Sequence, residues 1–442
     1  MIEANWVWGV IEIVLLCSLC MVGMHIFLVL GTLGWVFSVL YYGDTRAIIQ
    51  LGGIVWSRSY HYDMSMIPLF ILMGVWVEHA GLGKDAYDAC MRWFSRMKGS
   101  LAIVSIFANA FFGAVTGSAL AAVVTIGGVG LPEMKRYGYS AALRTGSIAS
   151  GSMLSNLIPP STIAVVYAIL TEESVGRILI AGIIPGIILT ILFSAVIYVW
   201  VSIRPNIAPM LPQDVHFTWG ERFRSTFLLI PIIIIFLVLV GGIYLGWFSP
   251  TEAAGIGAVT VLIVCLAYRR LSWNGFREAI IGSSRTSGMI LIILVGAFLF
   301  TGTIAQSRLH MAIIEMVEAA GLTFVPLAYI IIFIFIIAGM VLDTYAMAIL
   351  FIPLFYPVLS HVAGAPPMVG VWFGTLSVVL FQLAVLTPPF APILYITQML
   401  DGCPTIEVIK GALPFYVATA ILMVLMVQFP IIVTWLPSKM MG

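Results

Sequence analysis

The stretch from residue 145 to residue 168 most constrains what this chain can fold into. It reads TGSIASGSMLSNLIPPSTIAVVYA and holds no acidic or basic residue, so it could lie inside a lipid bilayer. Pro159 and Pro160 lack backbone donors and must interrupt a helix at that point. Interrupted backbone at membrane depth persists only where it packs within protein or lines a wet cavity. The interruption therefore indicates a binding site inside the membrane.

The composition supports a membrane location. The chain has 442 residues, of which 62% are hydrophobic and only 9% are charged. A soluble fold could not bury so much apolar surface, so we predict an all-α polytopic membrane protein. The net charge of +1 gives no basis for nucleic-acid binding. Cys17 and Cys20 stand in an apolar run, and we interpret them as small hydrophobic residues rather than as a redox or metal pair.

A second proline pair repeats the first one. Residues 382–397 read QLAVLTPPFAPILYIT, which aligns with LIPPSTIAVVYAI at an offset of 229. Upstream of each pair, GAVTGSALAAVVTIGGVGLPE at 113–133 aligns with GMVLDTYAMAILFIPLFYPVL at 339–359, at an offset of 226. Gly and Pro are common in membrane helices, so one match could arise by chance. Two matches at nearly one offset instead indicate a transporter site between two halves.

These alignments predict two inverted structural repeats. The first covers residues 1–203 and the second residues 226–442, joined by a cytoplasmic linker at 204–225. Each repeat is expected to hold a re-entrant helical hairpin and a broken helix, the hairpins near 101–132 and 325–358 and the Pro-Pro broken helices at 145–170 and 369–397. Most Lys and Arg lie in 84–98, 135–144, 204–224 and 269–285. These loops are therefore predicted to face the cytoplasm.

Asp343 is the most informative single residue. It is the sole acidic or basic residue between Ala319 and Ser360, and a carboxylate inside a membrane is costly and by default a functional hypothesis. One interpretation is that it holds a cation or shapes the hairpin tip. The other is that it caps a helix N-terminus and is satisfied by backbone N–H groups. The two roles can coexist.

The first half supplies oxygen atoms and flexible backbone without charge. Carbonyl, hydroxyl and carboxylate oxygens suit Na⁺, whereas a divalent ion would need more acidic groups. An anionic substrate would meet the N-terminal ends of broken helices. The competing explanation for the small residues is helix packing. The candidate Na⁺ ligands are Gly117, Ser118, Asn156, Pro159, Gly339, Asp343, Thr387 and Pro388, and the candidate substrate contacts are Ser152, Ser155, Ser161 and Thr344.

The chain resembles the large, DctM-like permease subunit of TRAP (tripartite ATP-independent periplasmic) transporters. The resemblance covers nearly the whole length and rests on GAVTGSALAAVVTIGGVGLPEMKRYGYS, LIPPSTIAVVYAILTEESVGRILIAGIIPG, SPTEAAGIGA, GMVLDTYAMAILFIPLFYPV and QLAVLTPPFAPILY. It implies an elevator-type secondary transporter of the bacterial inner membrane, with a scaffold and a mobile transport domain. It also implies Na⁺ coupling without another cofactor, a small four-helix membrane subunit, and a periplasmic binding protein that delivers an organic anion, often a carboxylate.

The sequence departs from the family pattern close to the expected site. The approach to the first proline pair is MLSNLIPP, the second pair continues as FAPILY, and MVGMHIFLVLG lacks the usual Gly-Pro-Ile-like run. Because the chain starts directly with the first span, we expect the small subunit to be a separate protein. An alternative is a stand-alone ion-coupled carrier that needs no binding protein. We do not expect an enzyme, since Asp343 stands alone and no HExxH motif occurs.

Overall fold

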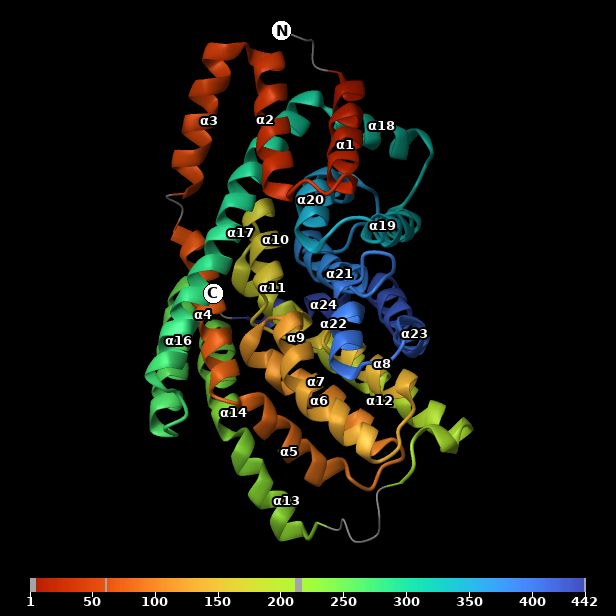
Figure 1. The fold of residues 1–442 in the computed structure, drawn as a ribbon. Coiled ribbons are helices and arrows are strands. Elements are labelled where there is room, and N and C mark those ends of the chain that lie inside the picture. Colours follow the sequence, from red (N-terminus) through yellow and green to blue (C-terminus); the bar gives the residue numbers. More distant parts are fainter. Residues whose placement is uncertain (1–4, 60–61, 211–216, 441–442) are drawn as a thin grey trace.

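Helices account for the regular structure of this chain. The computed structural model describes residues 5–59, 62–210 and 217–440, and no strand occurs within these ranges (Figure 1). In the same ranges, six helices are long and apolar enough to cross a membrane, or up to eight if each of two bent helix pairs counts as one span. The predicted all-α polytopic membrane fold is confirmed.

The first half ends in a long apolar helix. Its elements are α1 (Trp6–Met21), α2 (Ile26–Tyr42), α3 (Asp44–Ser59), α4 (Met66–His79), α5 (Leu82–Phe94), α6 (Ser100–Thr116), α7 (Ala119–Arg136), α8 (Ala141–Gly151), α9 (Leu154–Leu157), α10 (Thr162–Thr171), α11 (Val175–Ala181) and α12 (Ile183–Ile203).

The second half begins with a composite helix that includes a π-helical turn at Leu237–Gly241. Its elements are α13 (Trp219–Thr226), α14 (Ile230–Phe236), α15 (Gly242–Tyr244), α16 (Pro250–Ala267), α17 (Trp273–Ser307), α18 (Leu309–Ala319), α19 (Phe324–Gly339), α20 (Thr344–His361), α21 (Val369–Ala384), α22 (Pro392–Asp401), α23 (Thr405–Gln428) and α24 (Ile431–Thr434). Part of the predicted linker is thus the helix α13, and residues 211–216 lie outside the described residues.

The two halves contain matching elements in the same order. The α6–α7 hairpin corresponds to α19–α20, and the broken helix α8–α10 corresponds to α21–α22. Figure 1 shows the first hairpin in the lower half of the molecule and the second in the upper half, as inverted repeats require. Helices occupy 100–136 and 324–361, where the two hairpins are predicted, and 141–171 and 369–401, where the two broken helices are predicted; their assignment to two repeats stays a prediction. The exact division of the chain at residues 203 and 226 stays a prediction.

The outer helices form a frame of their own. In α1, the buried carboxylate of Glu12 accepts hydrogen bonds from Thr303 of α17 (2.7 Å) and from Tyr41 of α2 (3.4 Å). At Gly34 of α2, an added Cβ would collide with the backbone of Phe300 in α17. Helices that approach this closely in a membrane do so through small residues and shared hydrogen bonds. These contacts hold α1, α2 and α17 together.

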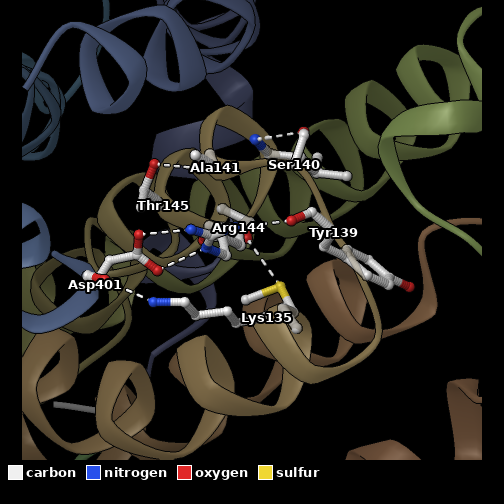
Figure 2. A network of polar contacts seen from close by, with 10 residues as sticks. Lys135, Tyr139, Ser140, Ala141, Arg144, Thr145 and Asp401 are labelled. Atoms are coloured by element: carbon white, nitrogen blue, oxygen red, sulfur yellow. Dashed lines mark hydrogen bonds and ion pairs between the residues drawn. The ribbon is translucent and has the colours of Figure 1, made fainter. Parts of the chain in front are cut away.

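The broken elements of the two halves pack into one body. Gly146 of α8 and Gly411 of α23 face each other so closely that a Cβ on either would collide with the backbone opposite. Next to this crossing, Arg144 of α8 binds Asp401 at the end of α22 through Nε–Oδ1 (2.6 Å) and Nη2–Oδ2 (2.8 Å). Figure 2 shows this pair, with Lys135 reaching the Asp401 carbonyl. A bidentate pair of this kind fixes both distance and orientation.

The Arg144–Asp401 pair should contribute strongly to stability. The two side chains are only 11% and 1% exposed, so Asp401→Asn would leave a guanidinium charge buried without its counter-charge. Removing one partner of a buried pair costs about 3–5 kcal/mol. We expect a loss of this size in the free energy of unfolding, measured by denaturant titration of the purified protein in micelles.

The exposed pair of Lys410 and Glu407, with an N–O distance of 3.4 Å, provides the control. Glu407→Gln should change stability by no more than about 1 kcal/mol, because water screens an exposed pair. Equal effects of Asp401→Asn and Glu407→Gln would show that the buried pair does not hold the two halves together.

Candidate functional site

A cavity of about 150 Å³ lies where the two hairpin tips meet the two helix breaks. All four broken elements contribute to its wall, as the alignment of the two halves predicts. None of the lining residues carries a formal charge. They are Gly117, Ser118, Ala119, Leu120, Asn156, Thr162, Ile163, Thr344, Tyr345, Gln382, Val385, Pro392 and Ile393.

Four helices begin at this cavity: α7, α10, α20 and α22. Three of them start with a side-chain cap. Ser118 accepts from the Ala121 N–H (3.3 Å) in α7, and Ser161 accepts from the Ala164 N–H in α10 at the same distance. Each helix start leaves further N–H groups without a partner inside its own helix. Four such ends around one uncharged cavity make a favourable environment for a negative group.

Asp343 supplies the third cap. Its Oδ1 accepts a hydrogen bond from the Ala346 N–H at 2.7 Å, at the start of α20. The capping interpretation of this residue is therefore confirmed. Asp343 itself does not line the cavity, but the next residue, Thr344, does. Its role as a cation ligand stays a prediction, which the cap does not contradict because a carboxylate that accepts from one N–H keeps further acceptor capacity.

The tip of the first hairpin depends on Gly117. This residue ends α6 with φ +61°, and its N–H donates to the Gly113 carbonyl (3.1 Å). A Cβ at Gly117 would collide with the carbonyl oxygen of Pro160, at the helix break. Glycine is needed here for both reasons, since L residues with a side chain are disfavoured at positive φ. The contact brings the hairpin tip directly against the break.

The structure separates the predicted site residues into two groups. Those that line the cavity are Gly117, Ser118, Asn156 and Thr344, and those that do not are Ser152, Ser155, Pro159, Ser161, Gly339, Asp343, Thr387 and Pro388. Several of the second group satisfy their own surroundings. Ser152 donates to the Ala149 carbonyl (2.7 Å), and Thr387 donates to the Leu383 carbonyl (2.7 Å).

Two further residues of that group hold the broken elements together. The buried hydroxyl of Ser155 donates to the Asn109 carbonyl at 3.3 Å, and its backbone packs against Gly113. Gly339 packs against Ala384, where a Cβ on the glycine would overlap with the alanine. These contacts agree with the helix-packing explanation of small residues. Whether any of them also binds an ion or substrate stays a prediction.

Gln382 is a cavity residue that the sequence analysis does not single out. Its side chain is 2% exposed, and its Oε1 has no hydrogen-bond partner among the described residues. The Oδ1 of Asn156 is also buried without such a partner. Buried polar atoms nearly always have partners, so two unsatisfied amide oxygens on residues that line one cavity indicate a ligand that donates hydrogen bonds or is a cation. One feature of the sequence could have identified Gln382. Its amide side chain stands alone in an apolar run, six residues before the second proline pair.

Gly117→Ala should impair binding in this cavity. The left-handed backbone costs a residue with a side chain about 1–2 kcal/mol, and the new methyl would push the hairpin tip away from Pro160. Since 1.4 kcal/mol corresponds to about tenfold, we expect ligand affinity to fall by about tenfold or more. Uptake measured against substrate concentration checks this.

Gly128→Ala is the matched control. Gly128 lies in α7 of the same hairpin, and nothing lies within 4 Å of an added Cβ. This variant should transport as the unmodified chain does. If Gly117→Ala also transports normally, the close contact between tip and break is not required.

Comparisons with known proteins agree with this architecture. The family described as "Tripartite ATP-independent periplasmic transporter, DctM component" matches residues 13–432. The C4-dicarboxylate TRAP transporter large permease protein DctM of Pseudomonas aeruginosa is 30% identical, over 87% of this chain and 86% of the relative. The ectoine TRAP transporter large permease protein TeaC of Halomonas elongata is 29% identical, over 84% of this chain and 85% of the relative.

Two more proteins extend the comparison. The sialic acid TRAP transporter large permease protein SiaM of Vibrio cholerae is 26% identical, over 89% of each chain. Among solved structures, the YdaH transporter of Alcanivorax borkumensis matches with a TM-score of 0.60, over 93% of this chain and 98% of that one. At 14% identity, this last likeness concerns the fold alone.

Proposed function

Because this chain belongs to the tripartite ATP-independent periplasmic transporter family, as its DctM component, we propose that it is the large membrane subunit of a Na⁺-coupled importer of organic anions. The resemblance seen in the sequence motifs is thereby confirmed, and it identifies a transporter subunit. The finer proposal is that a periplasmic binding protein delivers a carboxylate to the membrane subunit. Transport then follows elevator-type alternating access.

One observation gives the main support for an anionic substrate. The starts of α7, α10, α20 and α22 meet around a single cavity whose lining carries no formal charge. Helix N-termini stabilise negative groups through free N–H donors and the helix dipole. A carboxylate could therefore bind without an arginine in the wall. Two of the relatives named above are permeases for acids, C4-dicarboxylate and sialic acid.

Oxygen atoms near the same cavity support Na⁺ as the coupling ion. The tip of the first hairpin offers the backbone carbonyl of Gly117 and the hydroxyl of Ser118, and the second hairpin offers the carboxylate of Asp343. Such neutral oxygens with at most one carboxylate suit a monovalent cation. The site resembles other transporter sites in which unwound backbone holds the ion while helix N-termini hold the substrate.

The packing supports an elevator movement. The broken elements are tied into one body by Arg144–Asp401 and by the Gly146–Gly411 crossing, whereas α1, α2 and α17 form a separate frame. A body that carries the whole cavity can move as a unit against such a frame. We propose that the first is the transport domain and that the second is the scaffold.

The proposed partners follow from the family. They are a small four-helix membrane subunit, a periplasmic binding protein, the organic anion and the lipid bilayer, which is proposed to be the bacterial inner membrane. The outer helices α1, α2 and α3 present apolar side chains for contacts within the membrane, among them Val14, Trp35 and Ile49, which are 56%, 45% and 69% exposed. Either lipid or the small subunit could cover these residues.

Reconstitution tests the proposed function. We expect proteoliposomes with the large chain, the small subunit and the binding protein to take up labelled carboxylates only when an inward Na⁺ gradient is applied. Omitting either partner should abolish uptake. Uptake by the large chain alone would instead establish a stand-alone carrier, and uptake without Na⁺ would remove the proposed coupling ion.

Substitutions at Asp343 separate its two roles. Asn caps helices about as well as Asp, whereas Ala loses about 1 kcal/mol of capping energy. If the carboxylate binds Na⁺, Asp343→Asn should reduce Na⁺-dependent uptake while its thermal stability stays near that of the unmodified chain. Asp343→Ala should reduce both. Unchanged Na⁺ dependence in Asp343→Asn would remove this residue from the ion site.

A further inference from the structure

A second cavity, of about 460 Å³, lies outside the candidate functional site. It is formed by α6, α12 and α14, together with Ile158 at the first helix break. Its volume falls in the range of ordinary small-molecule sites, about 300–1,000 Å³. Representative lining residues are Phe107, Phe111, Ile187, Ile191, Ile233 and Phe236.

The chemistry of this cavity fits a hydrocarbon chain. Thr190 is its only lining residue with a polar side chain, and its hydroxyl donates to the Gly186 carbonyl at 2.8 Å. The only hydrogen-bond donor among these lining side chains is therefore already used within its own helix. Ile187 and Ile191 are 53% and 59% exposed on the outer surface of the protein. The cavity therefore opens toward the bilayer, where acyl chains are the available apolar molecules.

A buried cation lies on α13, the helix that precedes α14 in the chain. Arg222 of α13 is 9% exposed, its Nε has no hydrogen-bond partner among the described residues, and its guanidinium stacks on Trp219 at 5.1 Å. Buried polar atoms nearly always have a hydrogen-bond partner, so the Nε atom of Arg222 is an exception that needs an explanation. A phosphate group would satisfy it with charge-assisted hydrogen bonds. This unsatisfied nitrogen indicates that an anionic group belongs beside α13.

Direct contacts join the cation to the cavity. Phe107 in the cavity wall stacks on Phe94 of α5 with ring centroids 4.3 Å apart. The neighbouring Trp93 donates to Thr226 at 3.2 Å, and the Thr226 hydroxyl donates to the Arg222 carbonyl at 3.3 Å. A chain of contacts through α5 and α6 thus connects the backbone of α13 at Arg222 with the wall of the apolar cavity.

The spacing matches a phospholipid. Ten residues separate Arg222 from Ile232 in the cavity wall, which is about 15 Å along a helix at 1.5 Å per residue. Half of the hydrocarbon core of a bilayer is also about 15 Å. A lipid whose phosphate lies at Arg222 would therefore extend an acyl chain into the cavity. Arg92, Arg96 and Lys98 lie in the neighbouring polar segment, which is typical of the cytoplasmic face.

We propose that the crevice between α6, α12 and α14 binds one acyl chain of an anionic phospholipid of the inner leaflet, whose phosphate is held by Arg222. The lipid lies between α6 of the proposed transport domain and the neighbouring helices α12 and α14. It also contacts Ile158, the residue just before the first helix break. Binding is independent of which solute the protein transports.

Lipid binding to the purified complex tests the site. After delipidation, native mass spectrometry compares phosphatidylglycerol with phosphatidylcholine of identical acyl chains. The unmodified complex should retain one phosphatidylglycerol in preference to phosphatidylcholine. Ala110→Phe or Ala114→Phe fills the cavity and should lower retention by about tenfold, because a well-filled space tolerates extra volume poorly. Equal retention of both lipids by the unmodified complex would overturn the proposal.

Matched substitutions separate chain binding from headgroup binding. Arg222→Gln should abolish the preference for the anionic lipid, whereas Arg224→Gln, an exposed arginine of the same helix, should keep it. Val259→Phe changes an apolar residue of α16 that is 56% exposed and should leave retention unchanged. If the cavity variants retain the lipid as Val259→Phe does, or Arg222→Gln keeps the preference, the assignment is wrong.

A measurement on the unmodified complex covers the case in which the cavity variants do not fold. Phosphatidylglycerol with a photoreactive diazirine on its acyl chain is bound and activated, and the labelled peptides are identified. Labels should concentrate in α6, α12 and α14. Labels spread evenly over exposed apolar helices such as α16 would show ordinary bilayer contact and overturn the proposal.

Discussion

The need to satisfy backbone polar groups inside a bilayer governs this structure. Hydrocarbon offers no hydrogen bonds, so each helix interruption must be covered by protein or by a ligand. The breaks at Pro159–Pro160 and Pro388–Pro389 are therefore placed against the tips of two hairpins. Side chains cap several of the exposed helix starts, as Ser118, Ser161 and Asp343 do. What remains uncovered is a small polar cavity, which is where a ligand can bind.

The same constraint explains why the breaks come in pairs. A single interruption would leave a helix start facing lipid, whereas two halves of opposite orientation bring their starts together at one depth. The Gly146–Gly411 crossing brings backbone into contact with backbone, and Arg144 ties its own half to Asp401 of the other. Rigidity in this body protects the cavity's geometry. The frame around α17 needs no such precision, because it contributes no residue to the cavity wall.

The two cavities differ in the chemistry of their walls. One is small, is surrounded by helix starts and contains the unsatisfied amides of Asn156 and Gln382. The other is larger, apolar and open toward lipid, with Thr190 satisfied by its own helix. Ile158 lines the second cavity two residues after Asn156 lines the first. A lipid in the second cavity would thus contact the segment that forms the solute site.

The sequence by itself determined the fold class, the two proline breaks, both hairpins and the family, because long apolar runs and backbone-breaking residues act locally. It also determined the importance of the Gly117–Ser118 tip. Only the tertiary structure decided which side chains share a cavity. Gln382 joined it, while Ser152 and Thr387 bonded to their own helices. The direction of a side chain depends on how helices rotate and pack against partners more than 200 residues away, and local pattern does not contain that information.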